Sequence, residues 1–164
     1  MSTFQAGRAV SGDVWIGGAN ASGVALGSFT TKSGGYHGDL YAYGNVGKVV
    51  LAGTFGSTMN IFGSLTSLQI TKGDFAGDLN VTGNVGSLSI AASSGIGGLF
   101  RAGSNVHVGG LLSAAKAANY QTNNSGEEFG IFAHGVGSIQ LGALRLGPSN
   151  LPYHQGDLAI ELVP

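Results

Sequence analysis

One sequence motif recurs along this chain and constrains its fold more than any other feature. Its clearest copy, GDLNVTGNVGSLSI, runs from Gly77 to Ile90, and a close relative, GDLYAYGNVGKVVL, runs from Gly38 to Leu51. A shorter copy, SLTSLQI, covers residues 64–70. Self-similarity at a fixed period is the signature of a repeat fold, in which each unit buries its apolar face only against its neighbours.

The period can be measured from residues that hold the same place in successive copies. Lys48, Ser67 and Ser87 each precede an apolar-x-apolar triplet, and their spacing is nearly constant. Gly77 and Gly97 each open a Gly-x-Leu segment at the same spacing. The repeat unit is therefore about 20 residues long, a length typical of solenoid proteins.

Within one unit the apolar residues alternate with other residues. Leu79 and Val81 form one alternating pair, and Leu88 and Ile90 form another. Alternation with a period of two residues indicates strands with one face inward. We therefore predict an all-β fold, a single-stranded parallel β-helix of about 6–7 coils with two or three short strands in each coil. A leucine-rich repeat would need a Leu-x-x-Leu-x-Leu line that is missing, and an antiparallel sandwich would not explain the repeat.

We expect the whole chain, residues 1–164, to be one β-helix domain with four parts. These parts are irregular N-terminal coils (1–37), regular repeats (38–109), an insertion (110–134) and terminal coils (135–164). Leu111 to Tyr120 is rich in good helix formers, which predicts a short helix. The polar segment from Gln121 to Glu128 is expected to be a loop, so that a helical and loop insertion occupies residues 111–134.

Composition and charge argue against several classes of partner. The chain has 31 glycines, but 43% of its residues are hydrophobic, so disorder is not expected. Its net charge is −1 and its seven lysines and arginines are scattered, so we expect no nucleic-acid partner. No apolar run approaches the ~20 residues of a membrane-spanning helix. The absence of cysteine excludes disulfides and thiolate metal sites.

Aspartates recur at one place in the motif, after a glycine and before Leu or Val. They are Asp13, Asp39, Asp78 and Asp157. Stacked carboxylates are able to bind Ca²⁺, but Ser57 and Gly98, the residues expected at the equivalent positions, interrupt the column. We therefore interpret these aspartates as structural residues that accept backbone N–H groups at the corners of the coils.

Asparagines suggest a second column at the next corner. Asn45 and Asn84 belong to it, and Asn105 is a candidate third member. Asparagine tolerates the left-handed backbone and can hydrogen-bond to the coil above, so this column is also interpreted as structural.

An outward column of aromatic side chains is the best candidate for a binding surface. If Leu40 and Ala42 point inward, then Tyr41 and Tyr43 point outward. The matching outward positions hold Trp15, Asn80 and Phe100. Strict alternation would then turn Arg101 inward, unless a bulge reverses Phe100 and Arg101. Such aromatics can be covered by the chain itself, contact a partner subunit or stack on sugar rings, and all three remain open.

The sequence offers no clear catalytic or metal centre. Asp74 with Asp78, or the pair Glu127 and Glu128 near His134, could supply two carboxylates of the kind that glycosidases use. The chain has only eight carboxylate residues, however, and its four histidines lack ligand spacing. We expect a non-enzymatic protein with no catalytic residues, no cofactor and no bound metal.

Units such as GDLNVTGNVGSLSI resemble the Gly-rich β-helix repeats of large bacterial surface proteins of the adhesin type. The resemblance covers residues 38–109 best and residues 135–162 more weakly. It implies an exported adhesive or scaffolding role without catalytic residues. The pattern is also similar, more distantly, to bactofilins, and this likeness implies β-helices that polymerise end to end.

The leading functional hypothesis is a structural β-solenoid subunit that self-associates into a homo-oligomer, fibre or surface filament. It rests on the unpaired strand edges at the ends of a solenoid and on the lack of an obvious cap. An extracellular or cell-surface location is expected, with a cytoplasmic filament as the alternative. The alternative function is a carbohydrate-binding or carbohydrate-cleaving β-helix that uses the outward aromatic column, so the expected partners are a second copy of the chain or a glycan.

Overall fold

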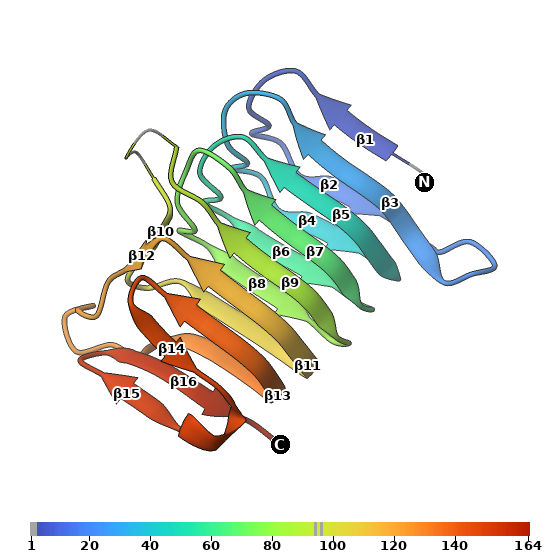
Figure 1. Cartoon of the computed structure of the whole chain (residues 1–164). Coiled ribbons are helices and arrows are strands. Elements are labelled where there is room, and N and C mark those ends of the chain that lie inside the picture. The colour runs from blue at the N-terminus through green and yellow to red at the C-terminus, as the bar shows by residue number, and fades with distance from the viewer. Residues whose placement is uncertain (1–2, 94, 96) are drawn as a thin grey trace.

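Successive strands of this chain stack in parallel, and the result is a β-solenoid of about six turns (Figure 1). The computed structural model describes residues 3–93, 95 and 97–164. The strands follow one another from the N-terminal end of the stack to the C-terminal end, as the colours of Figure 1 show. The prediction of an all-β parallel β-helix is confirmed.

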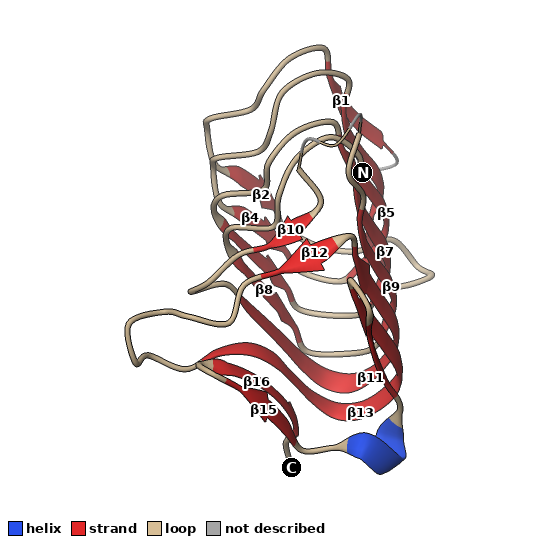
Figure 2. Cartoon of the chain, turned by 60° about the vertical axis from the view of Figure 1, so that its left-hand side comes forward, coloured by secondary structure: helices blue, strands red, loops and turns tan. Residues whose placement is uncertain are grey.

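Two faces of the solenoid are formed by parallel strands. The first, called here the β4 face, contains β2 (Val14–Ile16), β4 (Leu40–Ala42), β6 (Thr58–Ile61) and β8 (Asp78–Val81). The second contains β1 (Thr3–Ala6), β3 (Val24–Thr31), β5 (Asn45–Leu51), β7 (Leu65–Ile70) and β9 (Val85–Ile90). The long strands β11 (Asn105–Ala117) and β13 (Phe129–Leu141) bend from the β4 face to the second face (Figure 2).

The third side of the solenoid has little regular strand structure. Single parallel bridges join the coils there, and β10 (Leu99–Phe100) pairs with β12 (Asn119–Tyr120). This side contributes most of an aromatic stack in the core, to which β3 adds Phe29 and β13 adds Phe129. The members of the stack, all fully buried, are Phe29, Tyr36, Phe55, Phe75, Phe100 and Phe129. Ring centroids of neighbours in this stack lie between 5.1 and 6.4 Å apart. The core is therefore continuous along the axis, as a solenoid requires.

The strand register supports part of the repeat alignment and corrects the rest. Lys48 lies opposite Ser67, and Ser67 opposite Ser87, as the repeat period predicts. The equivalence of Gly77 and Gly97 is wrong, because the N–H of Gly98 donates to the carbonyl of Gly73. The chain between β9 and β10 is longer than in earlier coils, and this shifts every later position.

The predicted helix at residues 111–120 is also wrong. This segment forms the second half of β11 followed by β12, and Leu112, Ala115 and Ala117 are buried. Pairing with β9 satisfies the backbone there, so tertiary context overrides the helix propensity of alanine. The segment from Gln121 to Glu128 lies between β12 and β13 and contains no strand or helix.

The two ends of the solenoid differ. At the C-terminal end, β14 (Leu144–Leu146) pairs antiparallel with β13, a 3₁₀ turn follows at Pro148–Asn150, and β15 (Tyr153–Gln155) pairs antiparallel with β16 (Leu158–Leu162). At the N-terminal end, β1 and β2 each pair with one strand only among the described residues. The C-terminal end is thus capped by antiparallel strands, contrary to the expectation from sequence.

No helix in the described part of the chain is both long and apolar enough to cross a lipid bilayer.

Candidate functional site

The outward side chains of the β4 face form one continuous column, because the parallel register places equivalent residues side by side. In order along the axis the outward column is Trp15, Tyr41, Asn60, Asn80, His107, Phe132 and Glu161. The strand alternation that predicted outward positions for Trp15 and Tyr41 also explains the others.

Ring pairs and an amide pair alternate along this column. The rings of Trp15 and Tyr41 stack with centroids 4.0 Å apart, and Trp15 is 63% exposed. Next along the axis, the Nδ2 of Asn80 donates to the Oδ1 of Asn60 at 3.0 Å. Beyond them, the His107 and Phe132 rings stack at 5.0 Å. The face therefore offers flat apolar surface on both sides of a strip of hydrogen-bonding groups.

A second aromatic pair borders the outward column. Tyr43 follows β4 and Phe62 follows β6, and their rings stack with centroids 4.8 Å apart. Their exposed fractions are 47% and 48%, so both rings face solvent. Phe62 was not predicted, although a signal exists, because each of these residues directly follows an apolar-x-apolar pair at a strand end.

An open hollow of about 280 Å³ lies where the second pair meets the outward column. Its lining residues are Asn60, Ile61, Phe62, Asn80, Val81, Thr82, His107 and Gly109. An aromatic ring, two amides and an imidazole thus converge on one concavity. Such a combination of apolar surface with a few polar groups is typical of small-ligand sites.

The structure contradicts the expectation that Phe100 belongs to the outward column. Phe100 is fully buried, and its ring stacks on Phe75 at 5.4 Å. It pairs with Phe75 in a parallel bridge on the third side, so its position is set by the aromatic stack and not by the β4 face. The neighbouring Arg101 points outward and is about half exposed.

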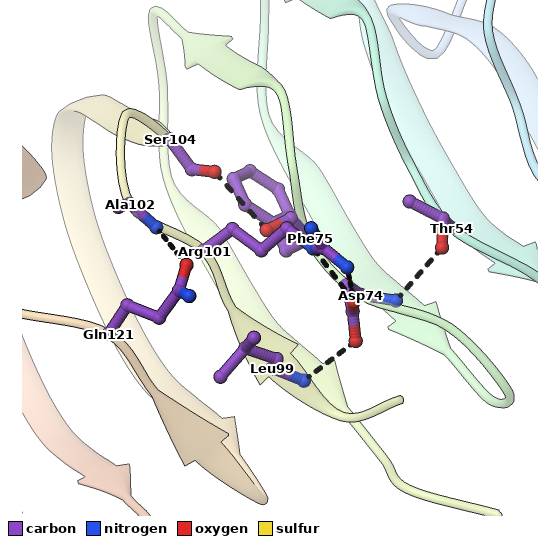
Figure 3. A network of polar contacts seen from close by, with 8 residues as sticks. All are labelled: Thr54, Asp74, Phe75, Leu99, Arg101, Ala102, Ser104 and Gln121. Atoms are coloured by element: carbon purple, nitrogen blue, oxygen red, sulfur yellow. Dashed lines mark hydrogen bonds and ion pairs between the residues drawn. The ribbon is translucent and has the colours of Figure 1, made fainter. Parts of the chain in front are cut away.

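Arg101 and Asp74 form the centre of a polar network on the third side (Figure 3). The Nη2 and Nε of Arg101 lie 2.7 and 2.8 Å from the Oδ2 of Asp74, and the N–H of Leu99 donates to its Oδ1 at 3.2 Å. Nearby, the hydroxyl of Ser104 donates to the carbonyl of Phe75. The network joins two adjacent coils next to the long connection between β9 and β10.

Asp74 and Asp78 make separate contacts. The Oδ1 of Asp78 accepts hydrogen bonds from both the backbone N–H and the side-chain amide of Asn105, each at 3.2 Å. Asp74 is held by Arg101. Both carboxylates thus serve contacts between coils.

The corner aspartates accept backbone N–H groups from the next coil. The Oδ1 of Asp13 accepts from Asp39 at 2.9 Å, and the Oδ1 of Asp39 accepts from Thr58 at 3.0 Å. In the strand register, the residues equivalent to Asp78 are Thr58 and Asn105. The repeat pattern of the sequence had predicted Ser57 and Gly98 at these positions. Asn105 therefore continues the aspartate column and does not belong to the asparagine column.

The asparagine column makes the same kind of contact at the next corner. The Oδ1 of Asn45 accepts from the N–H of Ser64 at 2.8 Å, and the Oδ1 of Asn84 accepts from the N–H of Leu111 at 2.8 Å. Between them, the Ser64 hydroxyl accepts from the N–H of Asn84 at 3.1 Å. These side chains hold the coils in register along one edge of the β4 face.

Asp157 lies outside the aspartate column and has a separate role. Its Oδ2 accepts the backbone N–H groups of Asn124 and Gly126, so it fixes the loop at residues 121–128 against the C-terminal end. These two hydrogen bonds lower the pKa of the Asp157 carboxyl from its ordinary value of 3.8, and the one from Asn124 has the larger effect.

We expect the anchoring of this loop to depend on pH with a defined sign. Because folding lowers the pKa of Asp157, the stability that its carboxylate gives to the folded loop is fully present above pH 3.8. This stability is lost as the pH falls through the pKa of Asp157 in the folded protein. In an NMR titration, the amide shifts of Asn124 and Gly126 should change together with a midpoint below 3.8. The Asp157→Asn variant should lack this titration. A midpoint at or above 3.8 would contradict the assignment.

Tyr36 is the one member of the aromatic stack that carries a hydroxyl. This hydroxyl is buried, and among the described residues it has no hydrogen bond of good geometry. The nearby backbone of Val14 lowers its pKa, but this effect is smaller than those that raise it. Burial, and then the charges of Asp13 and Asp39, raise its pKa. The raised pKa keeps the hydroxyl neutral at ordinary pH, as suits a residue of the core.

One group of side chains in the described part of the chain brings potential metal ligands together. Glu128, His154 and Glu161 place their ligand atoms within 4.8 Å of one another. The sequence did not reveal this group, because its members are far apart in the chain. Glu128 lies beside His154 and not, as the sequence suggested, beside His134.

Comparison of the chain with protein-family models, with curated proteins and with solved structures gave no match.

Proposed function

We propose that this protein is a non-enzymatic β-solenoid that binds a glycan chain along its β4 face. The observation that carries this proposal is the outward column, in which stacked rings flank the amides of Asn60 and Asn80. The apolar faces of sugar rings stack on exposed aromatic rings, while sugar hydroxyls pair with amides and imidazoles. The hollow beside Phe62 would accommodate one sugar unit of the glycan.

The size of the face favours a glycan over a protein partner. The outward column crosses seven strands, namely β2, β4, β6, β8, β11, β13 and β16. At ~4.8 Å spacing the face is about 29 Å long, and four residues of ~3.3 Å each make it about 13 Å wide. Its area is thus about 400 Å², half of the ~800 Å² that each partner of a stable protein complex buries. A linear polysaccharide, in contrast, can lie along its full length.

The same face argues for binding without cleavage. Hydrolysis of a glycosidic bond by the common mechanisms requires two carboxylates on either side of the bond. Glu161 is the one carboxylate in the outward column, and it lies at the C-terminal end, beyond the hollow. A glycan-binding module of this kind is suited to a cell-surface or extracellular location, and we include that location in the proposal.

The single tryptophan of the chain makes the proposal directly testable, because Trp15 lies in the outward column. We expect soluble polysaccharides that score on a glycan array to shift the Trp15 emission to shorter wavelength in a saturable titration. Phe62→Ala should weaken binding about tenfold, equivalent to about 1.4 kcal/mol. The matched control is Leu111→Ala, which removes a similarly exposed apolar side chain outside the hollow and should leave the affinity unchanged.

An array without binders, together with unchanged Trp15 emission, would contradict glycan binding. Equal losses in Phe62→Ala and Leu111→Ala would contradict the assignment of the site.

Self-association is the second candidate, and a separate observation favours it. The outer edges of β1 and β2 have no strand partner among the described residues, and such edges are templates for pairing with another chain. Because antiparallel strands cap the other end, this edge would support a pair of copies more readily than a filament. A concentration series in light scattering tests it: a defined dimer supports the candidate, and a monomer throughout contradicts it.

A further inference from the structure

Three side chains from separate segments converge at the C-terminal end of the solenoid. Glu128 ends the loop before β13, His154 lies in the middle of β15, and Glu161 lies in β16. The imidazole of His154 lies close to both carboxylates. Its Nε2 is 2.9 Å from the Oε1 of Glu161, and its Nδ1 is 3.9 Å from the Oε2 of Glu128.

The backbone that carries these side chains is held in place by independent contacts. β15 and β16 pair antiparallel, with His154 opposite Ala159. The Oε1 of Gln155 accepts hydrogen bonds from the hydroxyls of Tyr120 and Tyr153, at 2.9 and 2.8 Å. Asp157 fixes the loop that ends at Glu128. The three segments thus meet in a defined arrangement, and little ordering is left for a ligand to impose.

The charges of this group are not balanced by other side chains. Among the described residues, neither Glu128 nor Glu161 makes an ion pair with a lysine or arginine. Two carboxylates beside one imidazole attract positive charge, and a divalent cation would supply it.

We propose that Glu128, His154 and Glu161 bind a divalent transition-metal cation, with Zn²⁺ as its natural probe. One nitrogen and two oxygens from the protein, completed by water, match the open tetrahedral sites of zinc. Ligand atoms around zinc lie about 3.3 Å apart, so the group must close slightly from its present span. Glu128 and His154 are exposed enough to make this adjustment. Ca²⁺ and Mg²⁺ are disfavoured, because they prefer oxygen ligands throughout.

Such an ion would join the loop, β15 and β16, the three segments that cover the C-terminal end. Because the proposed ion binds the folded chain, zinc should raise the unfolding temperature of the protein. The site does not depend on glycan binding, so the two proposals can fail separately.

The test is calorimetric titration of the full, tag-free chain with ZnCl₂ at about pH 7.5, where an ordinary imidazole is neutral. At this pH we expect one zinc per chain and a higher unfolding temperature. At about pH 5 we expect weaker zinc binding, because a protonated imidazole cannot bind a metal. His154→Ala and Glu161→Gln should each lose at least about tenfold in affinity. Magnesium at the same concentration should give no heat of binding.

The control is His134→Ala, which removes another exposed histidine outside the group and should bind zinc as the unaltered protein does. Glu128→Gln is a further variant, since its side chain is exposed and its replacement should not affect folding. Absence of zinc binding, or unchanged affinity in His154→Ala, would overturn the proposal.

Discussion

Replacing Phe75 with alanine should lower the free energy of unfolding by about 3–5 kcal/mol. Phe75 is fully buried, and its ring lies 5.2 Å from that of Phe55 and 5.4 Å from that of Phe100. Its removal opens a cavity in the middle of the aromatic stack, between coils whose strands pair on the two sheet faces and cannot collapse inward freely. Urea unfolding followed by circular dichroism measures the loss.

The control for Phe75→Ala is Phe62→Ala, which removes the same side chain from an exposed ring pair. We expect it to change stability by about 0.5 kcal/mol or less, as is usual for surface positions. Each coil contacts only its neighbours, so Phe75→Ala should also broaden the transition by weakening the coupling between the two halves of the solenoid. A loss in Phe75→Ala no larger than that in Phe62→Ala would show that the stack does not stabilise the fold.

The aromatic stack also shows how far the sequence could predict this core. Tyr36, Phe55 and Phe75 recur with the same period as the motif, so the signal was present. Phe100 follows after a longer interval, because the chain between β9 and β10 is longer than in other coils. A fixed period therefore assigned Phe100 to the outward column, and only the bridge to Phe75 reveals its true place.

Local propensity led to a wrong prediction for a different reason. Alanines between Leu112 and Ala118 favour a helix in isolation, but they also fit the tight interior of a β-solenoid. Ala115 and Ala117 lie beside Leu88 and Ile90 of the previous coil, where the strand continues the core. In a repeat protein the neighbouring coil supplies the stronger constraint, and this neighbour was recognisable from the motif alone.

The candidate binding face was partly predictable, and the proposed metal group was not. Alternation within β2 and β4 correctly placed Trp15 and Tyr41 outward, because the strands themselves were correctly found. The group of Glu128, His154 and Glu161 depends on the path of a loop and on an antiparallel turn at the C-terminal end. Nothing in a fixed repeat period encodes those connections.

The close stacking of coils leads to the second large expected effect, in Gly77→Ala. A Cβ atom at Gly77 would lie 2.0 Å from the carbonyl oxygen of Ser57 and 2.7 Å from its nitrogen. Both are backbone atoms of the previous coil, so no side chain can move aside. The same Ser57 oxygen accepts the N–H of Asp78 at 2.9 Å, so separating the coils also breaks a ladder contact. We expect a loss of about 3 kcal/mol, at the upper end for overpacked sites.

The control for Gly77→Ala is Gly17→Ala, since a Cβ at Gly17 would meet no atom within 4 Å and its backbone is not left-handed. It should change stability by about 0.5 kcal/mol or less, and equal effects of the two substitutions would contradict the argument from close approach. The Gly77→Ala substitution should also affect the binding face. Asn80 lies on β8, three residues after Gly77, and hydrogen-bonds to Asn60 of the previous coil. A Gly77→Ala protein that still folds should separate these amides and weaken glycan binding, whereas Gly17→Ala should not.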